Sequence, residues 1–228
     1  MASHWRLLLL TVVCALAGAV LLSGCGDDAE EAATGATTVA PTTPSTPTTD
    51  APGGGDSLSI EERVISYGLA GLAPVAGPFT LATAAEFAAQ VDAENPAEET
   101  AALEAAGYTE GATHEYGRQG CDCFGVSGSV QFGSTEQAAE ELQRLESESK
   151  ADAADIREGS LPSVPGSRTL ESTLSEGGQT VTVVEVYFTD GPFLYAEIAG
   201  AAGKQLDKQQ LFADSTALYE RVKGRPPS

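Results

Sequence analysis

Two apolar segments separated by a turn constrain the fold of this chain more than any other feature. Residues 180–188 and 193–199 both have strand composition, and the Asp190-Gly191 dipeptide between them is typical of a two-residue hairpin turn. Each face of this hairpin is largely apolar and carries a single glutamate, Glu185 on one face and Glu197 on the other. A sheet with one solvated face alternates apolar and polar residues instead. The hairpin therefore predicts a sheet that is covered on both faces.

The sequence does not identify the element that covers the second face of the hairpin. The N-terminal helices are the favoured answer, and another chain or a ligand groove is the alternative. With Asp190-Gly191 as the turn, Phe188 faces Phe193, Val186 faces Tyr195, and Tyr187 faces Leu194. The aromatic residues Tyr187, Phe193 and Tyr195 are therefore the candidate lining of a groove.

Helices are predicted at five places in residues 57–224. Thr83 and Ser134 each begin a capping-box pattern, and Asn95 followed by Pro96 is a typical helix start. The five helices begin near Ser57, Thr83, Asn95, Ser134 and Lys204. In the fourth, Ala138, Ala139, Leu142 and Leu145 form the apolar stripe, and Glu136, Glu140, Glu141 and Glu148 are expected to face water.

Further strands are predicted between the helices. Residues 124–132 alternate apolar and polar side chains, which predicts a half-buried strand. Ala112, His114 and Tyr116 share one face of the strand before it, and 167–173 is a weaker candidate. Strands that follow one another through tight links favour antiparallel pairing. We therefore expect an α+β fold, with an antiparallel sheet of about four to five strands packed against helices in a single domain over 57–224.

The first 25 residues are typical of an export signal. Arg6 precedes an apolar run from Leu7 to Leu22, and small residues follow. The run ends in Leu22-Ser23-Gly24-Cys25, which resembles a bacterial lipobox. That resemblance implies cleavage after residue 24, so that 1–24 is a signal peptide, and attachment of acyl chains to Cys25. An uncleaved anchor helix is the alternative.

Residues 25–56 predict a disordered, lipid-anchored tether. The segment begins with acidic residues, continues with the Thr/Pro-rich stretch 34–49, and ends in Gly53-Gly54-Gly55. Such a composition has too little apolar surface to offset the entropy of ordering. The tether is therefore expected to hold the folded domain away from the membrane.

Three short segments of the domain resemble exported lipoproteins of high-GC Gram-positive bacteria. They are Ala101–Tyr108 (AALEAAGY), Phe132-Gly133-Ser134 before a helix, and Val164-Pro165-Gly166. The resemblance implies no activity.

Composition excludes several classes of function. The net charge of −21 leaves no excess of basic residues to neutralise phosphates, so nucleic acid is not expected as a partner. Once the signal peptide is removed, His114 is the only histidine. A histidine-rich zinc site, a His/Met haem site and a four-cysteine cluster therefore cannot be assembled in one copy, and neither a metal nor a cofactor is expected.

Cys121-Asp122-Cys123 is the one local constellation with candidate chemistry. In an exported protein the two cysteines are expected to pair as a disulfide. A ring this small contributes little loop entropy, roughly 1.6 kcal/mol before strain. The alternative is a thiol-disulfide redox role, because small bridges are readily reduced. Against that role, Asp122 disfavours a thiolate, and neither a lysine nor a second histidine lies beside the sulfurs.

The sequence thus favours a non-catalytic binding or scaffolding module at the cell envelope. We expect it to be anchored on the extracytoplasmic face of the membrane through the acyl chains of Cys25, and to bind an envelope protein or a small ligand. The redox role of Cys121 and Cys123 is the runner-up. A hydrolase with His114 as general base comes third, because the chain has no G-x-S-x-G elbow.

Overall fold

A computed structural model of the chain describes residues 58–91, 93, 95–152, 155–176, 179–202 and 206–224. The predicted signal peptide, Cys25 and the tether of residues 25–56 lie outside the described residues, and those assignments stay predictions.

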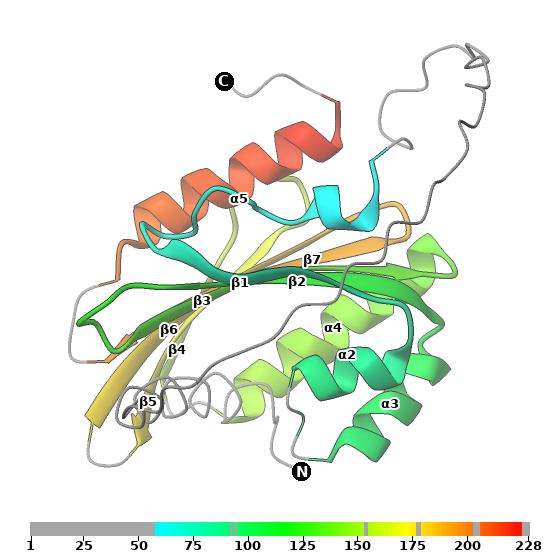
Figure 1. Ribbon diagram of the computed structural model, residues 1–228, viewed down its shortest axis with the longest axis horizontal. Helices are drawn as coiled ribbons and strands as arrows, with labels where there is room; N and C mark the ends of the chain where they lie inside the picture. The colour runs from blue at the N-terminus through cyan, green and yellow to red at the C-terminus, as the bar shows by residue number, and fades with distance from the viewer. Residues whose placement is uncertain are drawn as a thin grey trace, which may run out of the picture.

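The described residues form an α+β fold with one antiparallel sheet of seven strands, in the order β1-β2-β3-β7-β6-β5-β4 (Figure 1). The prediction of four to five strands was therefore too low. The strands are β1 (Ala73–Leu81), β2 (Tyr108–Gly117), β3 (Cys123–Phe132), β4 (Asp155–Gly159), β5 (Arg168–Glu176), β6 (Gln179–Asp190) and β7 (Phe193–Ala202). The helices are the 3-10 turn η1 (Ile60–Arg63) and α2 (Ala84–Gln90), α3 (Pro96–Ala105), α4 (Thr135–Asp152) and α5 (Lys208–Val222).

The helix starts follow the capping residues in the sequence. The Thr83 side chain accepts a hydrogen bond from the Glu86 amide at 3.1 Å, and Asn95 accepts one from the Glu98 amide at 3.3 Å. These bonds satisfy amide groups that have no partner within the first turn. The helix expected from Ser57 is shorter than predicted, because only η1 forms and the chain then runs in irregular structure to β1.

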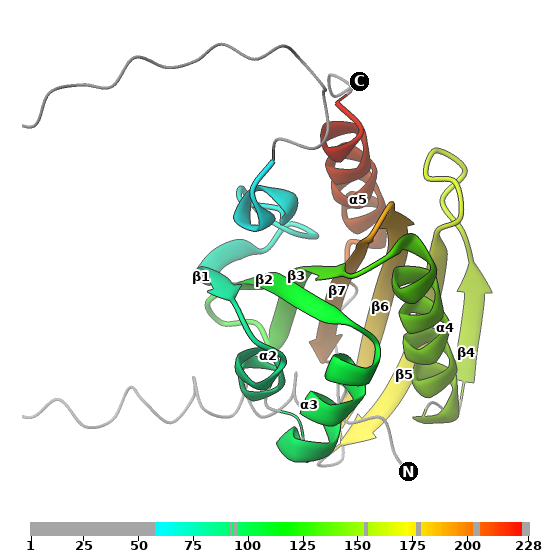
Figure 2. The same cartoon turned by 90° about the vertical axis from the view of Figure 1, so that its right-hand side faces the viewer.

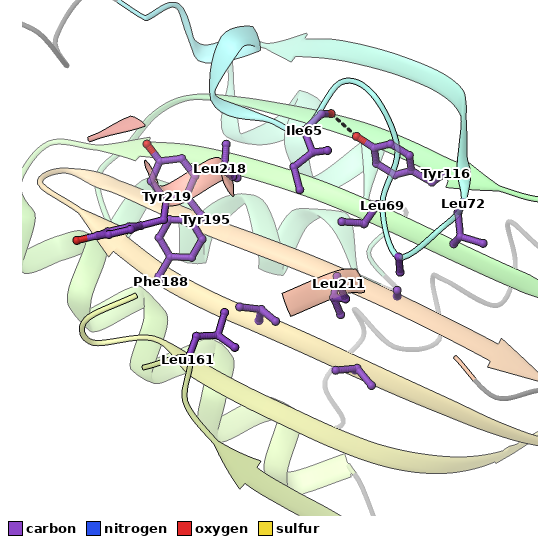
Figure 3. Packing of buried hydrophobic residues seen from close by; sticks show 14 of the residues in the cluster. Ile65, Leu69, Leu72, Tyr116, Leu161, Phe188, Tyr195, Leu211, Leu218 and Tyr219 are labelled. Carbon is purple, nitrogen blue, oxygen red and sulfur yellow. Dashed lines mark hydrogen bonds between the residues drawn. The ribbon is translucent and has the colours of Figure 1, made fainter. Parts of the chain in front are cut away.

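Helices cover both faces of the sheet, as Figure 2 shows. Helix α5 and the segment 58–72 lie on one face, and α2, α3 and α4 lie on the other (Figures 1 and 2). The first face buries Phe188 and Tyr195 against Leu211, Leu218 and Tyr219 of α5 (Figure 3). The prediction that both faces are covered is confirmed, and segments of the same chain supply the cover.

The second face has its own core beneath α2, α3 and α4. Phe87 of α2, Leu103 of α3 and Leu145 of α4 pack there with Tyr187 and Leu194 of the sheet. Strand β3 lies between the two layers and is buried on both faces, so the prediction of a half-buried strand over 124–132 was wrong: Ser127 and Ser129 have no exposed surface.

The hairpin forms between β6 and β7, with its turn one residue later than predicted. Asp190 pairs with Phe193, so Gly191 and Pro192 make the turn. Phe188 consequently faces Tyr195, not Phe193. The shift moves each pair by two residues and leaves every side chain on its expected face.

Candidate functional site

A row of three polar side chains crosses the sheet beneath the segment 58–72. His114 of β2 lies opposite Ser127 of β3, which in turn lies opposite Glu197 of β7. All three side chains are buried. Directly paired residues of neighbouring strands share one face of a sheet, so the row forms a continuous polar line in an otherwise apolar layer.

Hydrogen bonds connect this row to the backbone of Ile65. The Ile65 amide donates to Ser127 Oγ at 2.9 Å, and Ser127 Oγ donates to Glu197 Oε1 at 3.0 Å. The Ile65 carbonyl lies 2.9 Å from His114 Nδ1 and also accepts from the Tyr116 hydroxyl (Figure 3). A carbonyl oxygen only accepts, so Nδ1 of His114 carries the proton. The row therefore holds the segment 58–72 on the sheet.

Glu197 is the most perturbed group of the row. Burial raises the pKa of Glu197 well above its ordinary value of 4.5, although the Ser127 hydroxyl and the Arg221 guanidinium favour the ionised form. Asp214 of α5 also acts on this carboxyl group and raises its pKa further. Among the described residues, Glu197 Oε2 has no hydrogen-bond partner. Burial therefore favours the protonated form of this carboxyl group.

His114 and Ser127 do not form the catalytic pair that a hydrolase with His114 as general base would need. In the described part of the chain, Ser127 Oγ donates to Glu197 and His114 Nδ1 donates to the Ile65 carbonyl, so the hydroxyl and the imidazole are each directed elsewhere. A Ser-His catalytic pair requires a direct hydrogen bond between the hydroxyl and a basic ring nitrogen.

The structure brings two of the three candidate groove residues together, since the ring centres of Phe193 and Tyr195 lie 6.5 Å apart, and it separates Tyr187 from them. The Tyr195 hydroxyl accepts a hydrogen bond from Arg63 at 2.9 Å, and the Arg63 guanidinium lies 3.7 Å above the centre of the Phe193 ring. Tyr187 lies on the opposite face, where its hydroxyl donates to Glu185 at 3.2 Å. Tyr187 and Tyr195 are fully buried, and Phe193 is half-buried under Arg63. The three side chains therefore do not line a common groove.

The loop between β2 and β3 contains the two cysteines. The structure joins Cys121 and Cys123 as a disulfide, with the sulfurs 2.07 Å and the Cα atoms 5.1 Å apart. Arg118 Nη2 donates to the Cys121 sulfur at 3.6 Å. Arg118 is thus a cationic neighbour that was not predicted, although it lies only three residues before Cys121. Export of the protein, and oxidation of this pair in an oxidising compartment, stay predictions.

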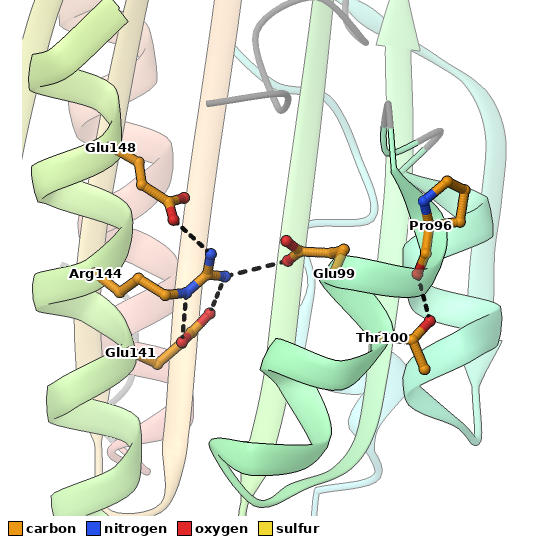
Figure 4. Close-up of polar contacts among 6 residues, drawn as sticks. All are labelled: Pro96, Glu99, Thr100, Glu141, Arg144 and Glu148. Atoms are coloured by element: carbon orange, nitrogen blue, oxygen red, sulfur yellow. Dashed lines mark hydrogen bonds and ion pairs between the residues drawn. The ribbon is translucent and has the colours of Figure 1, made fainter. Parts of the chain in front are cut away.

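An apolar hollow lies on the other face, between the sheet and helices α3 and α4. Gly128 and Ala196 form its floor, and Leu103 and Leu145 are among its walls. Arg144 of α4 bridges the two helices by pairing with Glu99 of α3 and with Glu141 and Glu148 of its own helix (Figure 4). Glu141 was expected to face water, but it is only 4% exposed because it lies under this arginine.

The two edges of the sheet differ in chemistry. Strand β4 is short and exposes the charged residues Asp155, Arg157 and Glu158. Strand β1 has nine residues without a charge, and two of them are prolines. The large apolar side chains that are exposed in the described residues all lie in β1 or just before it: Tyr67 is 61%, Val75 52% and Phe79 37% exposed. We call these three residues the β1 surface.

Neither a cluster of metal ligands nor a membrane-spanning helix is present among the described residues. They contain no group of His, Cys, Asp and Glu side chains that is suited to hold a metal ion. None of their helices is both long and apolar enough to span a bilayer.

Comparisons with known proteins give one structural likeness. No protein-family model and no curated protein matches the chain. The fold is similar to the crystal structure of the extracellular domain of PknH from Mycobacterium tuberculosis, with 15% sequence identity and a TM-score of 0.47. The match covers 72% of this chain and 96% of that one. A likeness of this size leaves the function to be argued from the residues of this chain.

Proposed function

We propose that this protein is a non-catalytic binding module, held at the extracytoplasmic face of the membrane by acyl chains on Cys25, and that the β1 surface binds a partner protein. The observation that carries the proposal is that, within the part of the chain that the structure describes, the exposed large apolar side chains are confined to Tyr67, Val75 and Phe79. Scattered apolar residues are ordinary on a protein surface, but their concentration along one uncharged edge marks an interaction site.

The charges beside the β1 surface favour a basic partner. Glu61 and Glu62 of η1 and Glu86 of α2 are exposed, and Glu115 of β2 is half-buried next to β1. Complementary charge around an apolar centre steers association and selects partners. A protein segment with apolar side chains flanked by lysine or arginine fits this edge.

The prolines of β1 favour docking through side chains over addition of a strand. Pro74 and Pro78 have no amide hydrogen, and the pairing of β1 with β2 shifts register twice. An edge of this kind offers an incomplete row of backbone donors to an incoming strand.

The anchor is tested by fractionating cells that express Cys25→Ser, with Cys14→Ser as the matched control. Cys25→Ser should lose its attachment to the membrane and accumulate as unprocessed precursor, whereas Cys14→Ser should behave like the wild type. Two or more acyl chains give stable attachment. Mass spectrometry that finds a wild-type chain without acyl groups would overturn the anchor.

The binding surface is tested by placing a photo-crosslinking amino acid at Phe79 in living cells, with Glu158 of β4 as the control position. We expect a discrete protein adduct from position 79 that is absent from position 158 and weakened by Val75→Glu. Adducts with lipid alone, or equal adducts from both positions, would refute the β1 surface as a protein-binding site.

A further inference from the structure

The two sulfurs of the Cys121–Cys123 bridge have unequal access to solvent. Cys123 is only 7% exposed and packs into the core beneath α5. Cys121 is half-buried at the edge of that core, in the loop that connects β2 to β3. A reagent approaching from solvent therefore meets Cys121 first.

Backbone hydrogen bonds hold this loop in place on both sides of the bridge. The Cys121 amide donates to the Arg118 carbonyl at 3.2 Å, and the Ala202 amide donates to the Asp122 carbonyl at 2.8 Å. Cys123 is paired with Ala201 in the sheet. These contacts do not involve the sulfur atoms, so the loop keeps its supports when the bridge opens.

Arg118 adds a charge at the accessible sulfur. Its Nη2 atom donates to Cys121 Sγ at 3.6 Å, and its side chain is otherwise exposed. A guanidinium beside a thiol stabilises the thiolate, which is both the nucleophile and the leaving group of disulfide exchange. Asp122 lies between the cysteines and opposes this effect, but its side chain is exposed and screened by solvent.

We propose that the Cys121–Cys123 bridge exchanges with dithiols of exported proteins and that Cys121 is the sulfur that reacts. A partner thiolate attacks Sγ of Cys121 and forms a mixed disulfide, while the Cys121–Cys123 bond breaks and Cys123 leaves as a thiolate that takes a proton from water. The second thiol of the partner, once deprotonated, then attacks the partner's own sulfur in the mixed disulfide. Cys121 leaves as a thiolate beside Arg118 and then takes a proton from water.

The two exchange steps balance in electrons and protons. Two electrons and two protons pass from the partner dithiol to the bridge, which is reduced, and the partner is oxidised to a disulfide. The inference is independent of the β1 surface, because it requires neither Val75 nor Phe79.

The choice of sulfur is tested on full-length chains in detergent with oxidised glutathione as the probe. We compare Cys123→Ser, which leaves Cys121 free, with Cys121→Ser, which leaves Cys123 free. The Cys121 thiol should form the mixed disulfide at least tenfold faster. Equal rates, or a faster Cys123, would overturn the assignment.

The role of Arg118 is tested by the pH dependence of the same reaction in the Cys123→Ser chain. Arg118→Gln should slow the reaction several-fold at neutral pH and move its half-maximal pH upward, and Arg118→Lys should restore most of the rate. A merely structural arginine would leave the pH profile unchanged, which would refute this role.

The wild-type chain gives a test that does not depend on any variant folding. Dithiothreitol should open the bridge in the native protein while the circular dichroism of the fold persists. If the bridge opens only when urea unfolds the domain, it is structural and the proposal fails.

Discussion

Single side chains in this domain carry large effects because the sheet is covered on both faces. Glu197 is the clearest case, since its carboxyl group has no exposed surface and receives one hydrogen bond, from Ser127. A buried carboxylate lacks the solvation that water gives it. The folded state therefore favours the protonated form, and the stability of the domain becomes dependent on pH.

We predict that Glu197→Gln removes a loss of stability that the wild type suffers as pH rises. The pKa of Glu197 is raised in the folded state. Its contribution to the free energy of unfolding is therefore complete below about pH 4.5 and declines as the pH rises toward the folded-state pKa. The limiting slope is about 1.4 kcal/mol per pH unit. Urea unfolding between pH 4.5 and 8 should show that the stability of the glutamine variant, relative to the wild type, increases with pH.

The exposed Glu158 provides the control for this measurement. Glu158→Gln should differ from the wild type by no more than about 0.5 kcal/mol at each pH, as is usual for surface substitutions. Asp214 and Arg221 act on the Glu197 carboxyl group, so their influence on its pKa is part of the effect that Glu197→Gln removes. A pH-independent difference between wild type and Glu197→Gln would contradict the prediction.

Two glycines on the same face of the sheet should respond in opposite directions to alanine. An added Cβ at Gly128 would lie 3.7 Å from its nearest neighbour, at the floor of the apolar hollow, whereas at Gly200 it would overlap the ring of Phe124. Gly128→Ala buries a methyl group and restricts the unfolded chain, so it should stabilise the domain by about 0.5–1.5 kcal/mol. Gly200→Ala should destabilise it by about 1–3 kcal/mol. Denaturation midpoints that move in the same direction would refute the contrast.

At the scale of elements, a charge cluster bridges helices α3 and α4 beside the apolar core that both helices share. Arg144 contacts Glu141 through both Nε and Nη2, and it reaches Glu99 of α3 at 3.1 Å (Figure 4). Glu141 is buried, so it depends on this arginine for its partner. Removing one member of a buried ion pair leaves the other charge without compensation.

We predict that Arg144→Met destabilises the domain by about 2–4 kcal/mol, chiefly by leaving Glu141 unpaired. Arg144 is about a quarter exposed, which places the effect below that of a fully buried pair. The double variant Arg144→Met/Glu141→Leu should recover at least half of the loss. Lys150→Met, which removes two more exposed ion pairs, with Glu146 and Glu158, should change stability by less than about 1 kcal/mol. Equal effects of the two single variants would contradict this account.

The elements that the sequence predicts well are those with a local cause. Capping residues placed the starts of α2 and α3, and alternation placed β6 and β7 on the correct faces. Strand β1 was missed because Pro74, Gly77 and Pro78 are typical of a loop. Gly77 is needed there, since its φ is +99° and a Cβ would lie 2.9 Å from the Thr113 carbonyl oxygen.

The candidate sites, like the elements, differ in whether a local feature of the sequence predicts them. The pairing of Cys121 with Cys123 was expected because two lone cysteines of an exported protein usually pair, and the structure places their sulfurs 2.07 Å apart. The row of His114, Ser127 and Glu197 instead depends on the register of three strands far apart in sequence. Alternation alone also assigned Ser127 to solvent. The cover that buries it comes from residues 58–72, whose irregular path has no periodic signal.

At the scale of the whole molecule, we predict that folding requires residues from about Ser57 onward and none of the tether. A chain that begins at Ser57 should unfold cooperatively at the same urea concentration as the mature chain, because every core residue described here lies beyond it. A chain that begins at Leu69 should be strongly destabilised, since it lacks the buried Ile60, Val64 and Ile65. A lower midpoint for the Ser57 chain would mean that the tether packs on the domain.

If the acyl chains proposed for Cys25 confine the protein to a membrane plane, the two edges of the sheet have a further consequence. Lipid-anchored copies collide in two dimensions at high local density, where exposed strand edges could join into polymers. At one edge Pro74 and Pro78 interrupt the row of backbone donors, and at the other a five-residue strand repels approach with its charges. A surface crowded with this domain should therefore stay monomeric, and each copy keeps its uncharged edge available to a different molecule.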